Sequence, residues 1–101
     1  MSDTIKILAK IEFSSNETGR QTPFYSGYRP AFTFPNARTM LSGRIDLFDR
    51  KSFAKGEVGK VEITFIKGMI NDEYFVVGQK FKFAEGLIPI GIGEIIEIIR
   101  K

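Results

Sequence analysis

The 101-residue sequence contains no cysteine, no histidine and no tryptophan. The absence of cysteine excludes a disulfide framework and thiol chemistry. Because histidine is absent as well, the usual general base, nucleophile and zinc-ligand sets are missing. The acidic residues that could pair, Asp46 with Asp49 and Asp72 with Glu73, form no convincing catalytic constellation. We therefore expect no enzymatic activity, no metal and no cofactor.

Long apolar runs are also absent. The N-terminal stretch MSDTIKILAKIEF has no apolar run behind a basic leader, so we expect neither a signal peptide nor a membrane span. There is no GxxxxGK[ST] phosphate loop, and Gly91-Ile92-Gly93 lacks the third glycine of a dinucleotide-binding fingerprint. We therefore expect no bound nucleotide. The default expectation is a soluble, cytoplasmic protein.

Neither sign of charge is in large excess. Fifteen lysines and arginines against twelve acidic residues leave a net charge of +3, which permits an anionic partner without requiring one. This balance gives no reason to expect DNA or a membrane as a partner. What the chain does have is apolar bulk, since 43% of it is hydrophobic and ten residues are phenylalanine. A chain of this size can fill the core of one domain over residues 1–101.

Apolar and polar side chains alternate in several segments, which is typical of half-buried β-strands. The clearest examples are residues 5–13, 41–48 and 61–65. Phe32 and Phe34 share one face of another short strand. Segments 74–77 and 80–83 are also rich in strand-forming residues, and Gly78-Gln79 between them predicts a two-residue type II′ hairpin turn.

The last segment, GLIPIGIGEIIEIIRK, is ambiguous by spacing alone. Its isoleucines at positions 95, 96, 98 and 99 would also suit a short helix. Branched side chains pack better on a pleated surface, and Pro89, Gly91 and Gly93 would damage a helix, so we expect a strand. Six or seven short strands without a good helix predict an all-β barrel or sandwich.

Three motifs resemble one known family. Residues 19–34 read GRQTPFYSGYRPAFTF, similar to the Gly-Arg-His-Thr-Pro-Phe-Phe run and the following Tyr-Arg-Pro near the start of domain III of translation elongation factor Tu. Residues 55–70, KGEVGKVEITFIKGMI, resemble the Pro-Gly-Asp stretch and long strand of that domain. Residues 80–98, KFKFAEGLIPIGIGEIIEI, resemble its closing Arg-Phe-Ala-Ile-Arg-Glu-Gly stretch and final Val-Gly-x-Gly strand. The resemblance covers nearly the whole chain in the order of the family, and it implies a six-stranded antiparallel closed β-barrel.

The resemblance also implies two binding surfaces. In the family, one face of domain III meets the T-stem of aminoacyl-tRNA, and another packs against the GTPase domain and meets the exchange factor. The positions that match the RNA-facing residues are Arg20, Ser42, Lys67, Glu85 and Gly86. Arg20 and Lys67 would neutralise phosphates. Glu85 could accept a hydrogen bond from a guanine amino group, and Gly86 would allow the backbone to approach the RNA closely.

The chain departs from the family at two of these motifs. Gln21 stands where the family has His, and Leu87-Ile88 stands where it has Gly-Arg. The second change removes a charge and adds apolar surface. Together with Ile90 and the isoleucine-rich tail, it favours a protein partner or self-association.

Other residues allow both a functional and a structural interpretation. The aromatic group Phe24, Tyr25, Tyr28, Phe32 and Phe34 could stack on bases, but we expect most of it to fill the barrel. Arg29 could contact a phosphate, although a structural role beside a ring or a carboxylate is the preferred interpretation.

Three hypotheses for the function remain. The first is a non-catalytic module for protein–protein interaction. The second is weak binding of the tRNA T-stem or another structured RNA. The third is a domain mimic that titrates a partner of the elongation factor.

Overall fold

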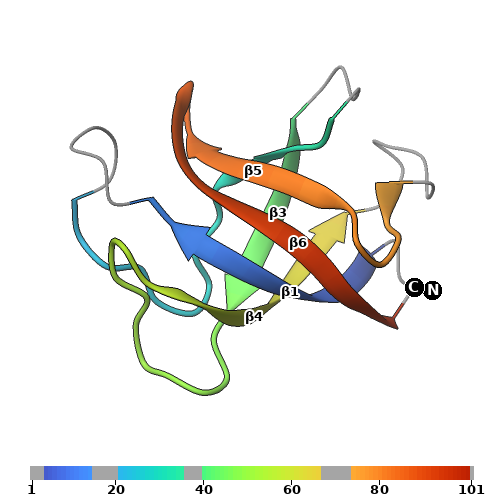
Figure 1. Ribbon diagram of the computed structural model, residues 1–101, viewed down its shortest axis with the longest axis horizontal. Coiled ribbons are helices and arrows are strands. Elements are labelled where there is room, and N and C mark those ends of the chain that lie inside the picture. Colours follow the sequence, from blue (N-terminus) through green and yellow to red (C-terminus); the bar gives the residue numbers. More distant parts are fainter. Residues whose placement is uncertain (1–3, 15–20, 36–39, 67–73, 101) are drawn as a thin grey trace.

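The computed structural model describes residues 4–14, 21–35, 40–66 and 74–100. The strands in that part of the chain are β1 (Thr4–Phe13), β2 (Ala31–Thr33), β3 (Leu41–Asp46), β4 (Val58–Ile66), β5 (Lys80–Glu85) and β6 (Ile88–Arg100). They form a closed barrel in the order β1-β4-β3-β2-β5-β6, and every neighbouring pair is antiparallel (Figure 1). The predicted six-stranded antiparallel barrel is confirmed. In the described residues there is no helix long and apolar enough to cross a membrane.

The alternation of side chains explains why the sheet closes. Along β1 every second residue from Ile5 to Phe13 is buried, and its intervening residues point outward. On the neighbouring β4, Val61, Ile63 and Phe65 are buried in the same way, with Ile63 directly opposite Ile7. A strand whose apolar face must leave water can do so only against other apolar faces, and curling the sheet into a barrel brings these faces together.

Aromatic rings supply most of the volume inside. Nine of the ten phenylalanines are at most 2% exposed. The rings of Phe13, Phe24 and Phe53 lie 5.3 to 5.5 Å apart and fill one end of the barrel. A second, larger group fills the middle and the other end; it consists of Phe32, Phe34, Phe65, Phe75, Phe81 and Phe83. Filling a small barrel with side chains leaves no open channel through it.

The two ends of the barrel differ in what covers them. The loops of residues 21–28 and 47–57 lie at one end together with the turn between β5 and β6, and we call this the hairpin end. Phe24 forms a bridge to Phe53 between the two loops. At the opposite end, the terminal end, β1 begins and β6 finishes, and Lys6 pairs with Arg100. In Figure 1 the loops of the hairpin end lie at the left and lower left and the β5–β6 turn at the top, while β1 begins and β6 finishes at the right.

The predicted hairpin at Gly78-Gln79 is wrong. The two-residue turn lies instead at Gly86-Leu87, because Glu85 and Ile88 are paired directly across it. Gly86 has a φ of 62°, the left-handed conformation that the first position of such a turn requires. A glycine at the first of two turn positions therefore does mark a hairpin in this chain, but the glycine is Gly86 and not Gly78.

Segment 74–77 is not a strand, although its residues favour one. It crosses the terminal end, where Phe75 packs between Phe34 and Phe65 at ring-centroid distances of 5.6 and 5.4 Å. Its neighbours Val76 and Val77 remain exposed. The Phe75 ring closes this end of the barrel. The free energy gained by burying it outweighs the modest strand propensity of the segment.

The isoleucine-rich C-terminal segment forms the long strand β6, as predicted. Its register against β1 shifts twice, and its register against β5 shifts once, between Phe83 and Ala84. Such bulges bend a strand, which lets 13 residues follow the curve of the barrel. One expectation for this segment fails, because Ile90 points into the core and adds nothing to the apolar surface.

Candidate binding surface at the hairpin end

Three of the five residues expected to face RNA can be placed. Arg20 and Lys67 lie outside the described residues. Ser42 on β3 is paired with Ala31 on β2, which is itself paired with Ala84 beside Glu85 on β5. With neighbouring strands about 4.8 Å apart, Ser42 lies roughly 10 Å from the β5 backbone at Ala84. The fold therefore brings positions more than 40 residues apart in the sequence onto one stretch of surface.

Glu85 is held in position from the barrel core. The hydroxyl of Tyr28 donates a hydrogen bond to its carboxylate oxygen Oε2, with an O···O distance of 2.6 Å. The ring of Tyr28 stacks on buried Phe24, with centroids 4.6 Å apart and planes tilted by 19°. A short hydrogen bond from a packed ring fixes the carboxylate and connects loop 21–28 to the β5–β6 turn.

The aromatic group that could stack on bases mostly fills the barrel, as expected. Phe24, Phe32 and Phe34 are buried, and Tyr28 is half-buried against the core. Tyr25 is the exception, because 60% of it is exposed.

Phe48 is a second exposed aromatic residue, at 56%. In the alternation that turns Leu41 and Ile45 inward, position 48 falls on the outward face with Arg44 and Asp46. It is the exception among ten phenylalanines. The available signal was its place in this alternation, three residues after inward-facing Ile45.

The backbone that carries Tyr25 and Phe48 is pinned to β3. Ser26 Oγ accepts a hydrogen bond from the Leu47 N–H at 2.8 Å and donates one to the Leu47 carbonyl at 3.3 Å. The Gly27 N–H donates to the Ile45 carbonyl at 2.8 Å. The two exposed rings are thus presented on either side of a fixed junction between two loops.

Leu87 is the most exposed large apolar residue in the described chain, at 90%. It occupies the second position of the β5–β6 turn, and Ile88, the next residue, is about half-exposed. We call Tyr25, Phe48, Leu87 and Ile88 the hairpin-end apolar residues. The Tyr28–Glu85 hydrogen bond and the Ser26–Leu47 junction join the three segments that carry them.

One cation at this end, Arg50, is already paired. Arg50 contacts Asp49 at 3.4 Å and Glu57 at 3.5 Å, and its guanidinium lies 4.6 Å from the centre of the Phe53 ring. The preferred structural role of Arg29 is not supported, because it is exposed and, within the described residues, has neither an ion pair nor a cation–π contact. Among the described residues of the hairpin end, Arg29, Arg50, Lys51 and Lys55 stand against Asp49, Glu57 and Glu85, so the charge there is nearly balanced.

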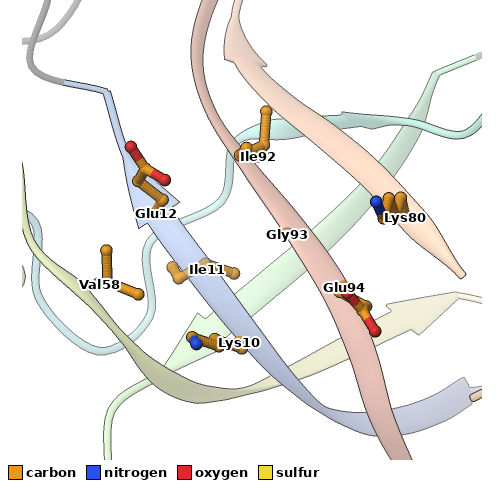
Figure 2. Close-up of a pocket in the computed structure, with 8 residues that line it drawn as sticks. All are labelled: Lys10, Ile11, Glu12, Val58, Lys80, Ile92, Gly93 and Glu94. Carbon is orange, nitrogen blue, oxygen red and sulfur yellow. The ribbon is translucent and has the colours of Figure 1, made fainter. Parts of the chain in front are cut away.

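A shallow depression lies on the side of the barrel over β1 and β6, with a volume of about 260 Å³ (Figure 2). Lys10, Glu12, Lys80 and Glu94 stand around the backbone of Gly93 in this view. Two cations and two anions leave no net charge for an ionic ligand. In the part of the chain that the structure describes, no group of acidic side chains could hold a metal ion.

No protein-family model matches the chain. The resemblance to domain III of elongation factor Tu therefore rests on the three sequence motifs, and the six-stranded barrel is consistent with it.

Proposed function

We propose that this chain is a non-catalytic binding module of the elongation factor Tu domain III type, and that its hairpin end binds another protein. The observation that carries the proposal is that the hairpin end exposes Leu87, the most exposed large apolar residue of the described chain, together with Tyr25 and Phe48, its two exposed aromatic residues. Aromatic and large aliphatic side chains dominate the centres of protein interfaces. Burying Leu87 alone would contribute about 1.5 to 3 kcal/mol.

The rigidity of the hairpin end supports the same function. Both loops and the turn are held by hydrogen bonds to the barrel, so their backbone loses little freedom when a partner binds. Preorganisation of this kind raises affinity because it reduces the entropy lost on association. The balanced charge favours a protein partner over a polyanion.

Site-specific photo-cross-linking tests the proposal. A photoreactive phenylalanine analogue is placed at position 87 and, as a control, at position 77, where Val77 is also exposed (65%) but lies at the opposite end. We expect a partner that cross-links from position 87 and not from position 77. That partner, once purified, should bind Leu87→Glu about tenfold more weakly than the wild type. Val77→Glu should bind it with unchanged affinity.

The identity of the cross-linked protein separates the alternatives. A second copy of the chain would make self-association the role of this end. A component of the translation machinery would support the interpretation as a domain mimic. Equal cross-linking from both positions, or unchanged affinity of Leu87→Glu, would refute a binding site at the hairpin end.

Structured RNA is the second candidate ligand. The observation in its favour is the run of small residues Ser42 and Ala31 on two neighbouring strands, next to buried Ala84 on the third strand and close to Gly86. Small side chains allow close approach to the wide, shallow minor groove of A-form RNA. Glu85, fixed by Tyr28, lies beside this run and could accept a hydrogen bond from a guanine amino group.

Fluorescence anisotropy with tRNA and with a short RNA duplex tests this candidate. We expect weak binding at low salt, with an affinity that falls as salt rises. Replacing both Arg20 and Lys67 by Ala should lower the slope of log K against log salt by about 1.5 to 2. Lys10→Ala, on the side of the barrel, is the control. RNA binding is excluded if neither RNA binds, or if the control changes the slope as much as the double variant.

A further inference from the structure

A second cavity lies at the seam between β2 and β5, on the side of the barrel rather than at the hairpin end. Its volume is about 470 Å³. It is lined by Thr33, Phe34, Pro35, Lys80, Phe81, Lys82, Ile92 and Gly93. The cavity opens where the ladder between the two strands stops, since the last pair is Thr33 with Lys82. Pro35 follows two residues later and has no N–H with which to continue the ladder.

The accessible apolar surface of this cavity comes from Pro35 and Ile92, and buried rings beneath it make its floor rigid. The rings of Phe34 and Phe81 lie 5.7 Å apart and are almost wholly buried. Phe34 also packs on Phe65 and Phe75, so the floor belongs to the core of the barrel. Ile92 flanks the opening and is half-exposed. Rings held on several sides cannot collapse into the cavity, which therefore persists without a ligand.

The rim of the cavity carries two cations and no carboxylate. Lys80 and Lys82 are two residues apart on β5, so both project from its outer face. Both are exposed, and within the described residues neither amino group has an ion-pair partner. The cross-strand neighbours of Lys82 are Thr33 and Ile92, which are uncharged.

One carboxylate lies nearby but belongs to the neighbouring depression. Glu94 is paired with Lys80 in the β5–β6 register, yet it lines the shallow depression of Figure 2 and not the cavity at the seam. Lys82 is therefore the cation best placed for an anion in the cavity.

We propose that this cavity binds a small apolar carboxylate, with its hydrocarbon body against Ile92 and Pro35, above the buried rings of Phe34 and Phe81, and its carboxylate paired with Lys82 and Lys80. The volume lies within the range of small-molecule sites. An apolar floor with a few polar groups at the rim is the usual arrangement of such sites. The Thr33 hydroxyl supplies an additional hydrogen-bonding group at the rim. This site is separate from the hairpin end, and neither proposal depends on the other.

Titration with 2-naphthoate, followed by backbone amide NMR shifts of the whole chain, tests the proposal. We expect the largest shifts at Thr33, Lys82 and Ile92. The uncharged analogue 2-naphthamide should bind about tenfold more weakly, because it lacks the charge that the lysines recognise. Lys82→Gln should weaken naphthoate about tenfold and leave the affinity for naphthamide nearly unchanged.

Two variants serve as controls. Lys60→Gln removes an equally exposed lysine from β4, outside the cavity lining, and should leave naphthoate binding unchanged. Glu94→Gln removes the carboxylate across from Lys80 and should strengthen binding about twofold. The proposal is overturned if naphthoate causes its shifts elsewhere, if naphthamide binds equally well, or if Lys60→Gln weakens binding as much as Lys82→Gln. A peptide ending in Glu-Phe that binds here while naphthoate does not would identify the site as a peptide-docking site instead.

Discussion

The ring of Phe83 on β5 occupies the space that a side chain at Gly91 on β6 would need. The two residues are direct cross-strand partners, and Phe81 covers Gly93 in the same way two pairs further along. A glycine in a strand contributes no packing of its own, and an aromatic ring laid across it from the next strand restores the lost contact. At both glycines, Gly91 and Gly93, a phenylalanine ring from β5 therefore fills the space that the glycine leaves inside the barrel.

Gly91→Ala should destabilise the protein by about 3 kcal/mol. The new methyl group would meet the Phe83 ring and also lie 2.6 Å from the backbone oxygen of Glu12, which cannot rotate away. Urea unfolding measures the change. Gly59→Ala is the control, because its closest contacts are with the far end of the Arg50 side chain, with the Phe53 ring at 3.3 Å, and it should cost about 1 kcal/mol. Equal losses in the two variants would contradict this account.

Gly86→Ala should cost about 1 to 2 kcal/mol for a different reason. Nothing lies within 4 Å of the new methyl group, so the loss comes from the φ of 62° alone. Gly86→Asn should recover part of it, since Asn adopts this conformation more readily than Ala. Thermal unfolding compares the two variants. If Ala proves as stable as Asn, the turn does not need a left-handed residue at this position.

Tyr28→Phe should cost about 1 kcal/mol, because it removes the hydrogen bond to Glu85 while keeping the stack on Phe24. A double-mutant cycle with Glu85→Gln isolates the contact, and we expect a coupling of about 1 kcal/mol in urea unfolding. Strictly additive effects would show that the two side chains do not interact in solution.

Phe75→Ala should be far more damaging than Phe48→Ala, although both remove one ring. Phe75 is buried between Phe34 and Phe65, so its loss leaves a cavity and should cost about 3 to 5 kcal/mol. Phe48 is mostly exposed, so its loss should stay within about 0.5 kcal/mol. Comparing the urea midpoints of the two variants tests whether segment 74–77 closes the barrel.

The candidate sites were only partly visible in the sequence. Motif resemblance pointed to Ser42, Glu85 and Gly86, but their proximity follows from β2, whose Ala31 is paired with both β3 and β5. The exposure of Tyr25 and Phe48 could not be predicted from residue type, since aromatic residues are usually buried. The cavity at the seam was also invisible, because it exists only where two strands distant in sequence stop pairing.

The sequence by itself determined which face of each strand is apolar, and with it the all-β class and the inward direction of residues such as Ile7 and Phe65. That information is local, because alternation in a strand has a period of two residues. The tertiary structure decided that Gly86 rather than Gly78 makes the tight hairpin turn, and that Phe75 leaves strand geometry to close the barrel. Both outcomes depend on the space left inside once six strands have closed, and no short stretch of sequence encodes that volume.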